Sequence, residues 1–436
     1  MTRKLSFILL STAVLLSTAA CGPTRNSEQP TPAPNTNANK ETGGQQGDNM
    51  PPKPDQLKIW APENEMELKS MREITARFTD ETGIKVEVVP FNPREQAKAF
   101  SLDGPAGNGP DLWGATHNSM GRNVLQGLAE PYRISEEQIV QYSPEAIQAV
   151  TINGEIYNLP MVIETTALYY NKDLLPEPPQ TWEELEAFSE TFTDASQDRF
   201  GFLIDATNFY YANMFMQGNG GYIFGYDEKT GYDANDIGLN NEGAVNGANL
   251  IKSWFEKKLI PTSINGDIMN GLFKEGKVGA VVNVPSGIKN YESSLGDKLG
   301  VAPLPKLANG QRPPSFLGIK GLVLSPFSKH KEWATELALF ITNDDNAASH
   351  FEIAAEIPAR PGILNSDLIT GHPYFSAIAE QAKYATPTPN NPEISQTWEP
   401  MKNALIFLSQ GHDTKEVLDE AVAQIQEQIA INNANQ

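Results

Sequence analysis

Strand-like and helix-like stretches alternate along residues 57–113 of this chain. Residues 57–61 and 84–88 place apolar side chains at every second position, which is the period of a strand, and residues 66–78 between them follow a helical period. After a polar helical stretch, residues 111–113 begin a third strand. Because parallel strands need a crossover that usually contains a helix, this order predicts a parallel α/β sheet.

Further strand and helix signals continue through the rest of the chain. Short apolar runs at residues 202–204 and 278–284 fit buried parallel strands, and residues 321–324 predict another strand. Residues 244–255 carry a helical period between them. The region 55–436 contains about 380 residues, which exceeds one ordinary domain, so we predict two α/β domains.

Three local signals predict where elements begin, end or turn. Pro62 suits the first position of the helix that follows the first strand, and Gly83 suits the end of that helix. Asn153-Gly154 lies between two short apolar pairs, which indicates a hairpin with a two-residue turn.

The first twenty residues have the order of a secretory signal. Two basic residues precede an apolar run over residues 5–16, which is too short to cross a membrane, and small residues follow it. Cys21 comes directly after two alanines, so the segment resembles a bacterial lipoprotein signal that is cleaved before Cys21. We predict a signal peptide at residues 1–20 and lipidation at Cys21, with an ordinary signal peptide and an incidental cysteine as the alternative.

Cys21 is the only cysteine in the chain, which excludes disulfides within the chain and metal sites built from several thiolates. The segment 21–54 consists mostly of Pro, Thr, Asn, Gln and Gly, so it cannot bury enough apolar surface to order itself. We predict a lipidated cysteine followed by a flexible tether. The body would then be lipid-anchored to a membrane of the cell envelope and face the periplasm or the outside of the cell.

The chain is strongly acidic. Its formal net charge of −21 combines +2 on residues 1–54, which carry five basic and three acidic side chains, with −23 on the remaining residues. This charge makes nucleic acid and anionic lipid head groups poor partners. Neutral or cationic ligands fit better.

No pattern for a cofactor or a catalytic centre is present. The five histidines never occur at metal-ligand spacing, and the sequence has no phosphate-binding loop, dinucleotide-binding turn, nucleophile elbow or calcium loop. We therefore predict no cofactor, no metal and no enzymatic activity. Two carboxylates that meet in space are enough for glycoside hydrolysis, so a glycosidase stays open as an alternative.

Aromatic residues near the ends of predicted elements indicate ligand binding instead. Trp60, Trp113 and Trp398 lie at such ends, and Tyr210 and Tyr211 follow a predicted strand. Aromatic faces pack on the C–H faces of sugar rings, while carboxylates and amides bond the hydroxyls. This combination suits a neutral polyol, although each aromatic residue taken alone fits ordinary packing equally well.

The segment from Pro160 to Glu177 resembles the signature of the family 1 extracellular solute-binding proteins. It has Pro160-Met161-Val162, then four residues, then Ala167-Leu168-Tyr169-Tyr170-Asn171, and finally Leu175 and Glu177. The likeness covers nearly the whole body and is closest to the maltose/maltodextrin-binding branch, with counterparts at residues 57–60, 82–86, 109–111, 170–176, 179–184, 220–222 and 273–276. The resemblance implies an α/β periplasmic-binding-protein fold of type II, in which two lobes with mostly parallel sheets flanked by helices are joined by hinge crossover strands.

Each lobe of that family is discontinuous in sequence. The resemblance implies an N-terminal lobe from residues 55–162 and 319–373 and a C-terminal lobe from residues 163–318 and 374–436. Glu164 would then lie at the cleft between the two lobes and face the ligand.

The resemblance also implies a ligand site. Glu164 would bond sugar hydroxyls, Tyr210 would stack on a sugar ring, and Trp398 would supply a second stacking face. Two stacking tryptophans of the maltose pattern appear here as Ala115 and Ser286, and its charged ligand residues appear as Asn64, Glu65, Asn118, Ser119 and Asn208. The candidate ligand-binding residues are Glu164, Tyr210, Trp398, Asn64, Glu65, Asn118, Asn208, Trp113 and Ser286.

These features predict a monomeric, membrane-anchored receptor that closes two lobes around an oligosaccharide of the maltose or maltodextrin type. It would deliver this sugar to the membrane-embedded permease subunits of an ABC importer. Another disaccharide or a glycoside is the alternative ligand. An iron receptor that uses Tyr210 and Tyr211 as phenolate ligands and a secreted glycosidase are the alternatives from other functional classes.

Overall fold

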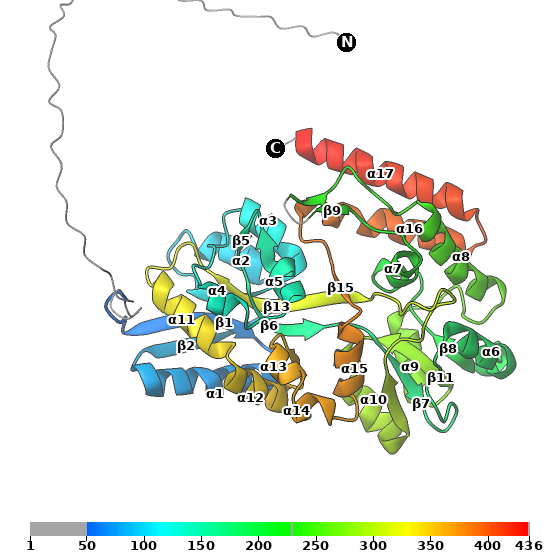
Figure 1. Cartoon of the computed structure of the whole chain (residues 1–436), viewed down its shortest axis with the longest axis horizontal. Coiled ribbons are helices and arrows are strands. Elements are labelled where there is room, and N and C mark those ends of the chain that lie inside the picture. The colour runs from blue at the N-terminus through cyan, green and yellow to red at the C-terminus, as the bar shows by residue number, and fades with distance from the viewer. Residues whose placement is uncertain (1–49, 228–229, 435–436) are drawn as a thin grey trace, which may run out of the picture. The chain divides into compact units, whose positions relative to one another are not determined.

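The computed structural model describes residues 50–227 and 230–434 (Figure 1). The predicted signal peptide, Cys21 and most of the predicted tether lie outside the described residues. The chain from Met50 onward clusters as one unit, and its secondary structure is built around two larger sheets and two small hairpins.

The larger sheet has seven strands in the order β14-β6-β13-β3-β1-β2, with β15 paired to β13 outside this path. Its strands are β1 (Gln56–Pro62), β2 (Lys85–Phe91), β3 (Leu112–Thr116), β6 (Leu159–Glu164), β13 (Phe316–Leu324), β14 (Ile357–Pro358) and β15 (Thr386–Pro387). β1 lies between β2 and β3 and pairs in parallel with both. This pairing confirms the parallel α/β arrangement predicted for residues 57–113.

The smaller sheet has four strands in the order β12-β7-β11-β8. Its strands are β7 (Ala167–Asn171), β8 (Phe200–Leu203), β11 (Val278–Asn283) and β12 (Leu299–Ala302). β8 and β11 pair in parallel and are buried along their length, as their apolar sequences predict.

Both sheets are mixed, whereas the resemblance implied mostly parallel ones. In the larger sheet β13 pairs antiparallel with β3 and β6, and β6 pairs antiparallel with β14. In the smaller sheet β7 pairs antiparallel with β11 and β12. The physical reason is that β13 reaches the larger sheet directly from the smaller one, so no helical crossover forces it to run parallel.

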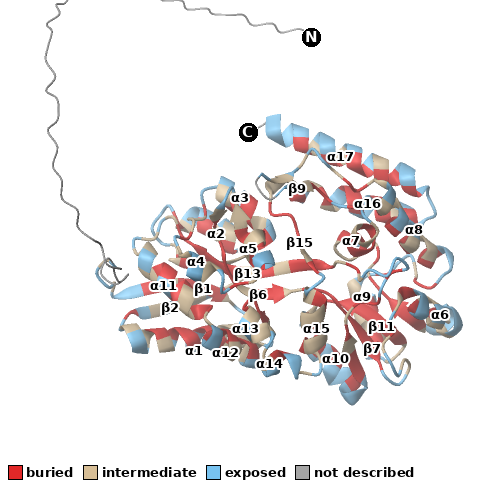
Figure 2. Ribbon diagram, viewed as in Figure 1, coloured by how far each residue is buried: buried red, intermediate tan, exposed pale blue. Residues whose placement is uncertain are grey.

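Helices cover both sheets (Figure 1). Around the larger sheet lie α1 (Glu65–Thr82), α2 (Gln96–Asp103), α3 (Met120–Leu125), α4 (Glu136–Ile139), α5 (Pro144–Val150), α11 (Lys331–Ile341), α12 (Asp344–Ala354), α13 (Pro361–Leu364) and α14 (Asp367–Thr370). Around the smaller sheet lie α6 (Trp182–Phe192), α7 (Phe209–Gly218), α8 (Glu242–Glu256), α9 (Gly266–Lys274), α10 (Ile288–Leu295), α15 (Phe375–Ala382), α16 (Trp398–Ser409) and α17 (Thr414–Ala434). Buried residues concentrate in the strands and on the helix faces turned toward them (Figure 2).

Shorter elements complete the fold. The hairpins are β4 (Thr151–Ile152) with β5 (Glu155–Ile156) and β9 (Gly225–Asp227) with β10 (Gly231–Asp233), and the 3-10 turns are η1 (His117–Ser119), η2 (Ala195–Gln197), η3 (Pro285–Gly287), η4 (Gly296–Lys298) and η5 (Pro392–Gln396). Among the described helices, none has both the length and the apolar character that crossing a membrane requires.

The local signals in the sequence are partly confirmed. Asn153 and Gly154 both have positive φ, 51° and 81°, and form the predicted turn between β4 and β5. Gly83 ends α1 with φ 78°. The predicted helix start at Pro62 is wrong, because Pro62 is the last residue of β1 and the side chain of Asn64 caps α1 by accepting from the first-turn amides.

Two segments connect the two sheets. Thr165 and Thr166 join β6 to β7, and residues 303–315 join β12 to β13. The buried hydroxyls of Thr165 and Ser315 lie 2.6 Å apart and hydrogen-bond, and the buried amide of Gln381 donates to Ser315 Oγ at 3.2 Å. Because breaking a buried polar contact leaves its partner unsatisfied, these bonds hold the two connections together. The lobe boundaries stay a prediction.

The chain enters the body at Pro51–Lys53. Trp333 Nε1 donates to the carbonyl oxygen of Pro51 at 2.9 Å, and Lys53 Nζ donates to the carbonyl oxygen of Thr82 at 2.9 Å. Residues 50–54, which the sequence assigned to the tether, therefore pack on α1 and α11. β1 then runs away from this entry point, so the entry point lies at the opposite end of the larger sheet from the carboxyl end of β1.

Candidate functional site

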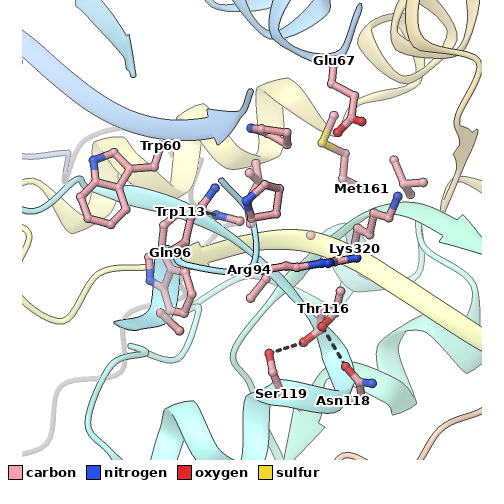
Figure 3. Close-up of a pocket in the computed structure, with 18 of the residues that line it drawn as sticks. Trp60, Glu67, Arg94, Gln96, Trp113, Thr116, Asn118, Ser119, Met161 and Lys320 are labelled. Carbon is pink, nitrogen blue, oxygen red and sulfur yellow. Dashed lines mark hydrogen bonds between the residues drawn. The ribbon is translucent and has the colours of Figure 1, made fainter. Parts of the chain in front are cut away.

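A cavity of about 780 Å³ lies where β1 and β3 end. Its wall includes Pro62 and Thr116 from these strand ends, Met161 and Lys320 from β6 and β13, and Trp398 from the start of α16. Ligands of open α/β sheets commonly bind beyond the carboxyl ends of parallel strands, where several loops converge. This cavity is therefore the candidate functional site (Figure 3).

A lysine and two carboxylates form ion pairs at this cavity. Lys320 Nζ lies 2.8 Å from Glu356 Oε1 and 3.3 Å from Glu164 Oε2. The other oxygen of Glu356 accepts a hydrogen bond from His350 Nε2 at 3.0 Å, and His350 Nδ1 lies 2.9 Å from Ser70 Oγ. The hydrogen bonds that link Ser70, His350 and Glu356 thus hold the ammonium of Lys320 in place.

Burial and charge pairing set the protonation of these groups. Burial alone would raise the pKa of Glu356, but the hydrogen bond from His350 and the ammonium of Lys320 outweigh it and lower this pKa to about 2. Burial would lower the pKa of Lys320, but Glu356 and Glu164 raise it above its usual range. Lys320 and Glu356 are therefore both ionised near neutral pH.

The loop after β3 supplies hydroxyl and amide groups to the cavity. Thr116 Oγ1 donates to Asn118 Oδ1 at 2.8 Å, and Ser119 Oγ donates to the carbonyl oxygen of Thr116 at 2.8 Å (Figure 3). The backbone N–H of Gly114 donates to Gln96 Oε1 at 2.8 Å. These bonds fix the loop so that Asn118, a predicted ligand residue, lines the cavity.

Aromatic residues gather beside the ion pairs. The half-buried ring of Trp398 lines the cavity and meets the ring of Phe316 at a centroid distance of 6.2 Å. Tyr210 lies on the same ring of Phe316 at 5.5 Å. Burial, followed by repulsion from the carboxylate of Glu164, raises the pKa of Tyr210. The structure thus brings together Glu164, Tyr210 and Trp398, the three residues to which the resemblance gave direct contact with ligand.

The other candidate ligand residues lie differently. Asn64 and Asn208 use their side-chain oxygens to cap α1 and α7. Glu65 and Ser286 are exposed and do not belong to the cavity wall. Trp113 borders the cavity, but its side chain is 1% exposed and packed in the core. This burial corrects the expectation that Trp113 presents a face to ligand.

Sequence reasoning missed five charged residues of the cavity wall: Glu67, Arg94, Arg122, Lys320 and Glu356. Lys320 had a visible signal, because it is the only charge in the otherwise apolar strand β13. Glu67 also had one, because it lies in the first helical turn after the carboxyl end of β1. Glu356 had none, since its approach to Lys320 depends on the pairing of the adjacent β14 with β6.

The structure gives no support to an iron site at the paired tyrosines. Burial raises the pKa of both Tyr210 and Tyr211, which disfavours the phenolate form that iron binds. In the part of the chain that the structure describes, no three His, Cys, Asp or Glu side chains are grouped closely enough to hold a metal ion.

Comparison with known proteins identifies the class of this receptor-like fold. Residues 73–377 match the family described as bacterial extracellular solute-binding protein. A galactooligosaccharide-binding protein of Bacillus subtilis (strain 168) is 35% identical over 436 residues and covers 98% of both chains. A maltooligosaccharide ABC transporter solute-binding lipoprotein of Streptococcus pneumoniae (strain ATCC BAA-255 / R6) is 30% identical over 367 residues, which are 82% of this chain and 86% of the relative. The crystal structure of a cyclo/maltodextrin-binding protein complexed with maltotetraose has a TM-score of 0.84 at 38% identity and covers 87% of this chain and 98% of that one.

The two mixed sheets and the cavity beside their connections are those of an α/β periplasmic-binding protein. The chain belongs to the family of bacterial extracellular solute-binding proteins and is close to the maltose/maltodextrin-binding proteins within it. This membership confirms the predicted family and fold. It also confirms that the protein is a binding protein rather than an enzyme, so the glycosidase alternative is withdrawn.

Proposed function

We propose that this protein captures a short oligosaccharide outside the cell and delivers it to the permease subunits of an ABC importer. The relatives named for galactooligosaccharides and maltooligosaccharides support this assignment. Binding and release of the sugar are the whole task, and the cavity at the ends of β1 and β3 is the binding site.

The observation that carries this proposal is that Trp398 and Lys320 line one cavity, where Lys320 Nζ lies 3.3 Å from Glu164 Oε2. An indole packs against the C–H face of a sugar ring, while a carboxylate and an ammonium bond its hydroxyls through charged hydrogen bonds. The cavity volume of about 780 Å³ is in the range of small-molecule sites, roughly 300 to 1,000 Å³.

Malto-oligosaccharides and galacto-oligosaccharides are the two candidate ligand classes. Ala115 and Ser286 stand where the maltose pattern has stacking tryptophans, so fewer aromatic faces are available for additional glucose rings. We therefore expect a long maltodextrin to gain little affinity over a disaccharide. Because the loss of these stacking faces weakens the case for malto-oligosaccharides, galacto-oligosaccharides are kept as the second candidate.

The proposed mechanism is closure of two lobes, one from residues 55–162 and 319–373 and the other from residues 163–318 and 374–436. In this division Lys320 belongs to the first lobe, whereas Trp398 belongs to the second. A sugar that contacts both residues binds the closed arrangement more tightly than the open one and so shifts the population toward closure.

Calorimetry with maltose, maltotriose, maltohexaose, galactobiose and galactotriose tests the proposed function. We expect saturable one-to-one binding of at least one short sugar, and a gain of less than about tenfold in affinity from maltose to maltohexaose. Failure of every sugar in this panel to bind would refute the proposal.

A further inference from the structure

Glu67 places in the cavity a carboxylate that no described protein atom bonds. The residue lies in the first turn of α1, lines the cavity and extends into it (Figure 3). Within residues 50–227 and 230–434 this carboxylate has no hydrogen-bond or ion-pair partner. Burial, followed by repulsion from Glu356, raises its pKa, although Lys320 and His350 partly oppose the shift. The side chain is only partly buried, so its carboxylate keeps acceptor capacity that a ligand hydroxyl in the cavity can use.

Lys320 supplies a donor to the same cavity. Its side chain is 43% exposed and lines the cavity wall together with Glu67. Two of the three N–H groups of the ammonium face Glu356 and Glu164. The third N–H group is therefore left for a ligand.

We propose that Glu67, Lys320 and Glu164 form a charged subsite that binds one terminal ring of the sugar through two neighbouring hydroxyls. One hydroxyl accepts from the third N–H of Lys320 and donates to Glu164, and the next hydroxyl donates to Glu67. This subsite deepens the proposed function and rests on it. Lys320 and Glu67 are specificity-determining residues for the captured sugar.

Glu356 and His350 act behind Lys320 as positioning residues. Both oxygens of Glu356 are engaged, one by Lys320 and the other by His350. His350 is 3% exposed and is itself held by Ser70. Since neither side chain has a free bonding group directed at the ligand, their part is to fix the direction of the Lys320 ammonium.

The charge of the subsite sets the class of ring that it takes. Glu67 and Glu164 offer carboxylate acceptors and Lys320 offers an ammonium donor, so the subsite is matched to hydroxyls, which both donate and accept. A neutral ring with two adjacent free hydroxyls fits. Methylation of these hydroxyls removes their donors and leaves the carboxylates unpaired in the cavity.

Calorimetry on the full chain tests the subsite with maltotriose, with galactotriose, and with both sugars methylated at the hydroxyls of the terminal non-reducing ring. Glu67→Gln and Lys320→Met are each expected to weaken the binding of the unmodified sugar by about tenfold to a hundredfold. The methylated sugar should lose much less from either change, whereas a purely structural role would weaken both sugars equally. Glu73→Gln is the control, because Glu73 is an exposed carboxylate on the same helix.

Lys320→Met removes the partner of two carboxylates and could therefore destabilise the fold. Glu67→Gln breaks no hydrogen bond or ion pair of the described protein, so it tests the subsite independently of folding. The melting temperature of Glu67→Gln without sugar should be at least that of the parent, because the change removes a carboxylate that burial and Glu356 disfavour. If the parent binds no sugar of the panel, the proposed function is overturned together with the subsite. If the parent binds and Glu67→Gln behaves like Glu73→Gln, the charged subsite alone is overturned.

Discussion

Glu164 is the last residue of β6, where the strand leaves the larger sheet. Its side chain is 26% exposed, and one of its oxygens faces the ammonium of Lys320. The carboxylate is thus partly dehydrated but still has acceptor capacity that the protein does not use. A group in this state differs from an ordinary surface carboxylate such as Glu177, which is exposed in the loop after β7.

Replacing Glu164 by Gln should therefore weaken sugar binding. The amide keeps the shape but is a neutral acceptor, and a charged hydrogen bond contributes about 1.5 to 3 kcal/mol, so the dissociation constant should rise on the order of tenfold to a hundredfold. Calorimetry measures this change, with Glu177→Gln as the control. Equal dissociation constants for Glu164→Gln and the parent would remove Glu164 from the site.

Trp398 permits a second prediction about a single residue. Its indole lines the cavity, so Trp398→Ala should weaken sugar binding by roughly 2 to 4 kcal/mol, the cost of losing an anchor residue. Phe407→Ala is the matched control, because Phe407 is a 41% exposed aromatic residue on the same helix α16. Sugar titrations followed by tryptophan fluorescence should also lose most of their signal in Trp398→Ala. An unchanged affinity with an intact fold would assign Trp398 to the core.

At the scale of elements, a buried histidine joins three parts of the larger sheet. His117 begins the turn after β3, and its Nδ1 accepts from the backbone N–H of Ile319 on β13 at 3.0 Å. Its Nε2 therefore carries the proton and donates to the carbonyl oxygen of Thr388, beyond β15, at 3.0 Å. Burial outweighs these two backbone hydrogen bonds and lowers the pKa of His117 to about 4.

This shift predicts a loss of stability in acid. Between pH 6.5, the ordinary pKa of histidine, and about pH 4, the unfolded chain takes up a proton that the folded chain refuses. His117 thus contributes stability that is complete above pH 6.5 and falls by about 3 kcal/mol as the pH approaches 4. Between pH 7 and pH 4.5, the free energy of unfolding measured in urea should fall less in His117→Gln than in the parent, by about 2 to 3 kcal/mol. The control is His412→Gln, at an exposed histidine, which should lose as much stability between these pH values as the parent does. An equal pH effect in both variants would contradict the assignment of this effect to His117.

Local sequence patterns predicted where strands and turns lie better than they predicted which strands pair. The alternation of residues 57–113 and the turn at Asn153-Gly154 were readable because periodicity and turn chemistry act over a few neighbours. The antiparallel pairing of β13 with β3 could not be predicted from local patterns, because the two strands lie far apart in the sequence. The site was likewise predicted only in part. The resemblance identified Glu164, whereas the contact of Lys320 with Glu356 joins two segments that no local sequence pattern relates.

At the scale of the whole molecule, we expect the predicted anchor and the described body to have separate tasks. The body from Met50 onward contains both sheets and the cavity, whereas Cys21 lies outside the described residues. If the anchor only holds the protein at a membrane, then its loss should change location and leave binding intact.

Cys21→Ser should accordingly move the protein from the membrane fraction to the soluble envelope fraction or the medium. The dissociation constant for sugar should stay the same, because the described cavity wall is built from residues between Trp60 and Trp398. Fractionation followed by immunoblotting, and calorimetry on the released chain, measure the two properties. Retention of the variant in membranes would contradict lipidation at Cys21.

The docking of Pro51 and Lys53 against Trp333 and Thr82 has a practical consequence for sensing sugars. β1 spans roughly 20 Å between this entry point and the cavity, because a strand rises about 3.3 Å per residue. A chip, bead or fusion partner joined directly at residue 50 would therefore be attached at the end of the larger sheet opposite the cavity. A reporter dye meant to signal capture belongs instead at the cavity rim, and the exposed position Ser395 in η5 offers an attachment point there.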